Sequence, residues 1–216
     1  MRRLALRGLR TYLTRGAEQT RGHDVPDPNP AALAFLRTRR SRPAKTLGLP
    51  VPDEATLADL LTLAARSPDH GKLEPWRFVV LTKPALARIA GLVAARGAAL
   101  GLPPDRIDKG ASQFVTGNLA VAVVCSPKPH ATIPPIEQHL SAGAVCLALL
   151  NAALASGWGA NWLSGWPSHD PWVCTEGLGL GPGEFVAGII HIGTETCAPP
   201  ERPRPDVAAL TTWMRA

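Results

Sequence analysis

The pattern of hydrophobic and polar positions along the chain predicts several helices and a small number of strands. Apolar-periodic or Ala-rich segments predict helices over 31–39, 55–66, 84–100, 136–156 and 207–215. Short apolar, β-branched or aromatic runs predict strands over 76–81, 119–125, 161–164 and 185–193. Because the order of these elements is not a regular βα repeat, we expect an α/β or α+β fold with a mixed sheet.

Local signals set several boundaries of these elements. Asp53 precedes the second helix and is expected to cap it. Residues 67–72 form a turn, in which Asp69 is expected to shape the backbone. The polar segment 17–30 is a linker. We therefore divide the chain into a basic N-terminal extension with its linker over 1–29 and one folded domain over 30–216.

Composition narrows the protein class only slightly. The chain has 216 residues, of which 45% are hydrophobic, enough for one sizeable core. Its net charge of +6 suits a small anionic ligand or incidental nucleic-acid affinity without identifying either. The four cysteines show no CxxC spacing, so we expect neither a disulfide framework nor a metal site. A reducing, cytoplasmic location is the default.

Two segments raise the question of membranes. Arginines 2, 3, 7, 10 and 15 alternate with leucines near the N-terminus, which fits a membrane-surface helix, a targeting peptide or a solvated extension. We favour the solvated extension or a docking helix, because no long apolar run of a secretory signal follows. Residues 140–168 carry no charge, but serine, asparagine and glycine interrupt them. We expect a buried helix there and no integral membrane segment.

Several familiar catalytic and binding motifs are absent from the sequence. There is no G-x-G-x-x-G after a strand, no Walker loop, no HExxH and no GxSxG elbow. The six histidines are scattered, and aromatic residues form 5% of the chain with no RNA-binding pattern. Hydrolysis by a triad or a metal, and recognition of nucleic acid by base stacking, are therefore disfavoured.

Five sets of residues, taken in order, resemble the FMN-dependent nitroreductase family. They are the segments 38–42 (TRRSR), 64–70 with 74–78 (AARSPDH and EPWRF), 137–138 with 141–143, 157–165 (GWGANWLSG), and 192–194 with 202–205 (RPRP). The resemblance covers about residues 31–210 and is closest to short, compact members. It implies an α+β sandwich with a mixed central sheet flanked by helices, in an intertwined homodimer.

The resemblance also assigns the ligands of the FMN phosphate. Arginine forms bidentate, charge-assisted hydrogen bonds to phosphate. Arg39 and Arg204 are the expected ligands, with Arg40 and Ser41 beside them, and Arg204 is favoured over Arg202. The alternative for any one of these arginines is a solvated surface side chain.

Two further sets of residues are implied by the same resemblance. Arg66 and His70 would reach FMN across the dimer interface, although Arg66 could instead cap its own helix and His70 could be a plain turn residue. The backbone of Trp162, Leu163 and Ser164 would lie along the isoalloxazine ring or ribityl chain. A plain strand with Trp162 in the core is the alternative, and the two are compatible.

Two positions depart from the family pattern. Glu74 stands where relatives usually carry Gln or Asn, and an ionised carboxylate cannot donate a hydrogen bond. Leu163 is apolar where a close relative could carry Arg. Both departures bear on substrate preference more than on FMN binding.

The expected activity is that of an NAD(P)H-dependent FMN oxidoreductase. A hydride would pass from NAD(P)H through flavin N5 to a small acceptor such as a nitroaromatic, quinone or enone, in ping-pong order and without a catalytic protein acid or base. The segment 100–116 is the expected substrate lid. Alternatives are a reductive dehalogenase, a flavin-cleaving oxygenase, or a non-enzymatic basic protein that binds membranes or nucleic acid. The sequence does not distinguish NADH from NADPH.

Overall fold

The computed structural model describes residues 26–215, in two units that divide between Thr38 and Arg39. The arginines expected to form a basic N-terminal arm lie outside the described residues. In the first unit, helix α2 spans Pro30–Thr38, one residue earlier than predicted, and the Oδ1 atom of Asn29 accepts a hydrogen bond from Ala32 N at 3.0 Å. None of its side chains is buried.

A five-stranded sheet forms the centre of the second unit. Its strands are β1 (Leu47–Gly48), β2 (Trp76–Thr82), β3 (Leu119–Cys125), β4 (Gly159–Leu163) and β5 (Phe185–Glu195). Strand β5 is central: it pairs with β3 on one side and with β4 and β1 on the other, while β2 pairs with β3. Every one of these pairings is antiparallel, so the described residues supply no parallel pair of the kind that a mixed sheet contains.

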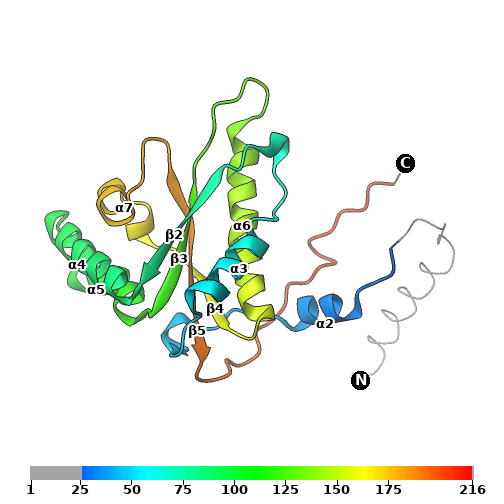
Figure 1. The fold of residues 1–216 in the computed structure, drawn as a ribbon, viewed down its shortest axis with the longest axis horizontal. Coiled ribbons are helices and arrows are strands. Elements are labelled where there is room, and N and C mark those ends of the chain that lie inside the picture. Colours follow the sequence, from blue (N-terminus) through cyan, green and yellow to red (C-terminus); the bar gives the residue numbers. More distant parts are fainter. Residues whose placement is uncertain (1–25, 216) are drawn as a thin grey trace. The chain divides into compact units, whose positions relative to one another are not determined.

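Helices cover both faces of this sheet, as Figure 1 shows. They are α3 (Glu54–Ala64), α4 (Lys83–Ala99), α5 (Pro104–Thr116), α6 (Pro135–Ala155) and α7 (Pro171–Leu178). The described residues also form short 3-10 helices: η1 (Ala44–Thr46), η2 (His70–Lys72) and η3 (Trp166–Ser168). The predicted α+β class, with a central sheet between helices, is confirmed.

The two faces of β3 belong to two different cores. Ala120, Ala122 and Val124 pack with α4, α5 and α7, whereas Leu119, Val121 and Val123 pack with α3 and α6. Successive side chains of a strand point to opposite faces, so a strand covered on both sides must be apolar throughout. This explains why 119–125 is a continuous apolar run rather than an alternating one.

Helix α6 contains most of the uncharged run from residue 140, which the sequence predicted to form a buried helix. It is the one helix of the described residues that is long and apolar enough to span a membrane, and its inner face packs on the sheet through Val145, Cys146 and Leu149. Its outer face nevertheless exposes Ile136, Leu140 and Leu147. The helix is therefore buried on one side only within a single chain.

The sequence prediction fails in four places, of which the first is the two-residue strand β1, which was missed. Helices α5 and α7 were missed: α5 mixes polar and apolar residues with a glycine, and α7 has only eight residues. The helix predicted over 207–215 is wrong, because that segment forms only a turn over 207–210. Short helices depend on packing an apolar face, and the apolar side chains of this tail are exposed.

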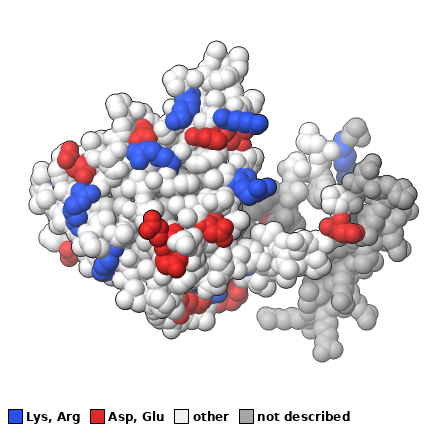
Figure 2. Space-filling view, in the orientation of Figure 1, with Lys and Arg blue, Asp and Glu red and all other residues white. Residues whose placement is uncertain are grey.

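Three of the four cysteines are buried in the core, and the charged side chains are spread over the surface (Figure 2). Cys125, Cys146 and Cys174 are buried free thiols, and burial raises their pKa values to about 11, 12 and 11. Buried thiols of this kind are small apolar groups rather than nucleophiles. Acidic and basic side chains are interspersed over the face shown in Figure 2, which carries no continuous basic patch.

One ion pair ties the start of β2 to the loop before β5. Arg77 donates from Nε and Nη2 to the two carboxylate oxygens of Glu184 at 2.8 and 2.7 Å, and Nη2 also reaches Gly179 O at 3.0 Å. The Glu184 carboxylate accepts a further bond from Gly181 N at 2.9 Å. The hydrogen bonds from Arg77 are the main reason that the pKa of Glu184 falls to about 2.

We expect Glu184→Gln to lower the free energy of unfolding by about 1–3 kcal/mol at pH 7, because Arg77 loses a charged partner. The folded-state pKa of about 2 lies below the ordinary 4.5, so this stabilisation is present above pH 4.5 and is lost as pH falls toward 2. Urea titrations at pH 7 and pH 3 measure it.

The matched control is Glu176→Gln, at an exposed glutamate whose side chain makes no ion pair with the described residues. We expect it to change stability by less than about 0.5 kcal/mol. A deficit in Glu184→Gln that stays the same at both pH values would contradict the role of the ion pair.

Candidate functional site

Three distant segments meet in a cavity of about 810 Å³, which we call the arginine pocket. It contains Arg39, Arg40, Arg202 and Arg204, and the remaining lining residues are Ser41, Pro43, Asn161, Trp162, Pro203 and Pro205. Four of the residues predicted to bind phosphate are therefore brought together, and Arg202 joins them. The prediction favoured Arg204 over Arg202, but both line the pocket.

The pocket is strongly electropositive, and two of its donors are unused. Arg39 Nε and Arg40 Nη1 are buried and have no hydrogen-bond partner among the described residues. Burial, and then repulsion from Arg204, lowers the pKa of Arg39. Arg204 itself forms an ion pair with the exposed Glu201, at 2.9 Å. Buried donors without partners are costly, so the arrangement fits an anion with several acceptor oxygens.

Backbone hydrogen bonds hold the first arginine segment against β4. Arg42 N donates to Ala160 O at 2.8 Å, and the Nδ2 atom of Asn161 donates to Arg42 O at 2.6 Å. The Arg42 side chain pairs with Glu195 at the end of β5, at 3.2 Å. The segment therefore carries Arg39, Arg40 and Ser41 in a fixed position at the edge of the sheet.

Trp162 forms one wall of the arginine pocket. It pairs with Ile190 across the β4–β5 ladder, and its indole lies over Gly188, two residues along β5. A Cβ atom on Gly188 would overlap the indole ring. Trp162 is 37% exposed, so it both packs on the sheet and faces the pocket.

A second cavity, the α5 pocket, lies beyond the end of β4. Its volume is about 640 Å³, and it is lined by α5 residues Asp105, Arg106, Lys109, Gly110, Ser112 and Gln113 and by the segment Leu163, Ser164, Gly165 and Trp166. Trp166 Nε1 donates to Arg106 O at 3.2 Å, and the indole occupies the notch that Gly110 leaves open. Leu163 and Ser164, both predicted site residues, belong to this pocket.

Strand β4 connects the two cavities. Asn161 and Trp162 line the arginine pocket, and Leu163 and Ser164, immediately after them, line the α5 pocket. Among the described residues β4 pairs only with β5, which leaves its other edge largely unpaired. These residues form one elongated candidate site. The arginine pocket lies at one end, the edge of β4 in the middle, and the α5 pocket at the other end.

Arg66 and His70 lie in neither cavity. Arg66 is exposed after the end of α3, and His70 Nδ1 contacts Glu137 Oε2 of α6 at 2.6 Å, beside a shallow cavity that Leu140 and Ser141 also line. Within one described chain these two residues do not join the other predicted ligands. Asp69 shapes the turn as predicted, since its carboxylate accepts a bond from Glu74 N at 2.7 Å.

Sequence reasoning missed the contribution of α5. It treated the segment 100–116 as a lid and named none of its residues as part of a site. Arg106, Lys109, Gly110 and Gln113 recur at helical spacing of three and four residues, which places them on one face. That spacing was the available signal, but the low overall hydrophobicity of the segment obscured it.

The chain is similar to known proteins of one family. The model of the Nitroreductase family matches residues 36–194. The Escherichia coli (strain K12) protein named "Putative NAD(P)H nitroreductase YdjA" is 31% identical over 163 residues, which cover 76% of this chain and 87% of that protein.

Two solved structures are similar in fold. A nitroreductase-like family protein from Bacillus cereus is 22% identical with a TM-score of 0.71, covering 89% of this chain and all of that one. A nitroreductase with bound FMN from Bacteroides fragilis is 18% identical with a TM-score of 0.67, covering 87% of this chain and all of that one.

The contact between Trp162 and Gly188 gives a direct test of the pocket wall. Because a methyl group at position 188 overlaps the indole, we expect Gly188→Ala to displace Trp162 and to cost about 1–3 kcal/mol of stability. Near-UV circular dichroism reports the indole, and urea unfolding reports the stability.

Gly91→Ala in α4 is the control, since a Cβ there meets nothing within 4 Å. It should be neutral, or stabilising by up to about 1 kcal/mol. An unchanged near-UV spectrum and stability in Gly188→Ala would show that Trp162 does not form a fixed wall.

Proposed function

Because the chain belongs to the nitroreductase family, we propose that it is an FMN-dependent oxidoreductase that transfers electrons from NAD(P)H to a small organic acceptor. The observation that carries the proposal is the continuity of β4 between the arginine pocket and the α5 pocket. A molecule with a phosphate at one end and a flat redox-active ring at the other matches that arrangement.

The residues of the arginine pocket fit the phosphate of FMN. A phosphomonoester carries a charge of about −1.5 to −2 near neutral pH and presents three acceptor oxygens. Arg39 Nε and Arg40 Nη1 are buried donors in need of such acceptors. We propose that Arg39, Arg40, Ser41 and Arg204 hold the phosphate, and that Arg202 adds to the positive field.

The far end of β4 fits the ring. The backbone of Trp162, Leu163 and Ser164 would lie along the ribityl chain and isoalloxazine, and the α5 pocket would admit nicotinamide and acceptor in turn, which implies ping-pong kinetics. When bound, FMN supplies hydride acceptance from NAD(P)H and electron donation to the acceptor. The protein then needs no acid or base of its own, only orientation and exclusion of water.

The two departures from the family pattern fall in different places. Glu74 is exposed and lines neither cavity, so we infer that it is not a cofactor ligand within its own chain. Leu163 lines the α5 pocket, where its apolar side chain favours apolar parts of an acceptor. Nitroaromatics, quinones and enones are the acceptor classes that we propose.

Buried free thiols suit a reducing compartment, and we propose that the protein is located in the cytoplasm.

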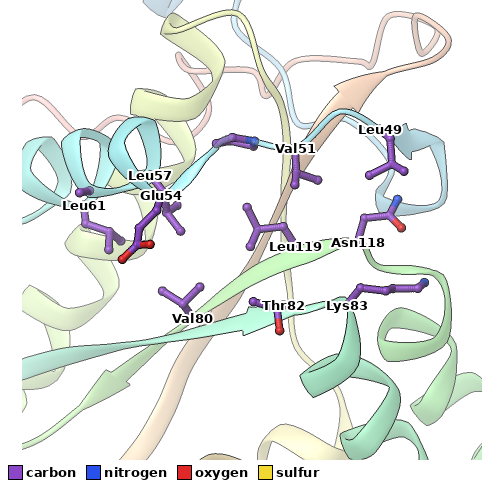
Figure 3. A pocket seen from close by; sticks show the side chains of 12 residues that line it. Leu49, Val51, Glu54, Leu57, Leu61, Val80, Thr82, Lys83, Asn118 and Leu119 are labelled. Carbon is purple, nitrogen blue, oxygen red and sulfur yellow. The ribbon is translucent and has the colours of Figure 1, made fainter.

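We further propose that the active protein is an intertwined homodimer. Three apolar surfaces of the single chain lack cover: the outer face of α6, the tail side chains Val207, Leu210, Trp213 and Met214, and a groove of about 750 Å³ beside β2. In Figure 3, Leu57 and Leu61 of α3 face Val80 of β2 across this groove.

The tail and the groove are complementary, because both are apolar. Strand β2 pairs only with β3 among the described residues, so its outer edge is open at the groove. Exposed apolar side chains on an extended tail gain stability when they are buried in an apolar groove. Exchange of tails between two copies would cover both surfaces. In such a dimer, we propose, Arg66 and His70 of one copy reach the FMN of the other, as the family resemblance implies.

The first experiment is a visible absorption spectrum of the protein purified or reconstituted with FMN. We expect a flavin spectrum that bleaches on anaerobic addition of NADPH or NADH and returns with an acceptor. Double-reciprocal plots should be parallel. A protein that stays colourless after incubation with FMN would contradict the proposed function.

The same absorption experiment on the variant Arg39→Ala tests which residues hold the phosphate. Arg39→Ala removes a buried charged donor, so FMN affinity should fall by about 2–5 kcal/mol. Arg37→Ala, an exposed arginine two residues earlier, should keep its flavin. Full occupancy in Arg39→Ala would show that another group holds the phosphate.

Light scattering tests the dimer. We expect about twice the chain mass of 22.8 kDa for the intact protein. Removal of residues 206–216 should shift the population toward monomer and lower the FMN content, because the apolar tail contacts are lost. A flavin-loaded monomer at micromolar concentration would refute the intertwined arrangement.

A further inference from the structure

Gln113 is a buried amide whose hydrogen bonds are incomplete. Its side chain lies on α5 and the residue is only 8% exposed. Its Oε1 atom is buried and has no hydrogen-bond partner among the described residues, whereas Nε2 is not among the buried unpaired atoms. Buried polar groups are nearly always paired, so the side chain is held with its oxygen inward at some cost, and Nε2 stays free to donate to a molecule in the pocket.

The amide nitrogen lies at the wall that α5 shares with the end of β4. Nε2 is 3.8 Å from the position that a Cβ on Gly165 would occupy, and both residues line the α5 pocket. Glycine at this position leaves the amide uncovered. A ligand resting on Leu163 and Ser164 would therefore meet an N–H donor on the facing helix.

The helix holds this donor in a fixed place. The neighbouring side chains Ala111 and Phe114 are buried in the core. On the pocket side, Trp166 fills the notch at Gly110 and bonds to Arg106 O. Because α5 is anchored on both sides, Gln113 is a preorganised donor and not part of a loose lid.

We propose that Gln113 is the specificity-determining donor of the acceptor site, and that it selects aromatic acceptors whose reducible group carries an oxygen. The inference rests on the proposed function, because it assigns the α5 pocket to the acceptor. Nitro, quinone and enone groups all present an oxygen lone pair to an amide N–H. Hydrocarbon ligands of the same shape leave the donor unpaired, which costs binding.

The test compares two isosteric ligands on the oxidised, FMN-loaded protein, where no turnover occurs. Calorimetric titration gives Kd for nitrobenzene and for isopropylbenzene. In Gln113→Leu we expect nitrobenzene to bind about tenfold more weakly, the loss of one hydrogen bond. Isopropylbenzene should bind equally or more tightly. Gln113→Met, another apolar side chain of similar length, should repeat the result.

Thr116→Ala is the matched control, because Thr116 lies on the same helix but outside the pocket, and its hydroxyl already donates to Ser112 O at 2.8 Å. Both Kd values should be unchanged. A second readout is reoxidation of the reduced protein: Gln113→Leu should slow nitrobenzene reduction and leave reaction with ferricyanide, an inorganic one-electron acceptor, unaffected.

Other outcomes would overturn the assignment. Equal Kd changes for both ligands would mean that Gln113 only shapes the pocket, and no change would mean that it serves the fold alone. A changed flavin spectrum in Gln113→Leu without a change in ligand selectivity would place the hydrogen bond on the cofactor. If the unmodified protein fails to bind FMN, the proposed function itself fails, independently of Gln113.

Discussion

The pairing of β5 with three other strands is the constraint on which the rest of the structure depends. Its ladder to β3 forms the wall between the two cores, and its ladder to β4 fixes the strand that links both pockets. Its last residues pair with β1 and, through Glu195, hold Arg42 beside the arginine pocket. A shift of one residue in this register would exchange core and pocket side chains along β4.

The arginine pocket lowers the stability of the folded chain. Placing Arg39 near Arg204 with buried, unpartnered nitrogens costs free energy, and the lowered pKa of Arg39 expresses that cost. The hydrogen bonds donated by the Arg42 backbone and the Asn161 side chain hold the segment in place regardless. An anion that binds there relieves the repulsion, so ligand binding and stability should be coupled.

Part of the candidate site could be predicted, because arginines and a hydroxyl near one another in the sequence are residue types that suit an anion. Arg39, Arg40, Ser41 and Arg204 do line one cavity. Trp162 lines the same cavity, and Leu163 and Ser164 line the next one. Gln113 was not predictable, since one glutamine in a polar segment carries no signal until its burial is known. The helix predicted over 207–215 is wrong for a different reason. Apolar residues are present there, but no surface among the described residues covers them.

The sequence alone therefore determined the secondary structure of strongly patterned segments, the α+β class and the arginine-rich chemistry of the candidate site, because these depend on local periodicity and side-chain type. Only the tertiary structure decided the antiparallel pairing around β5, the docking of Trp166 at Gly110 and the burial of Gln113. Those features join residues far apart in the chain, and their energies depend on close packing and on partners that no local pattern encodes.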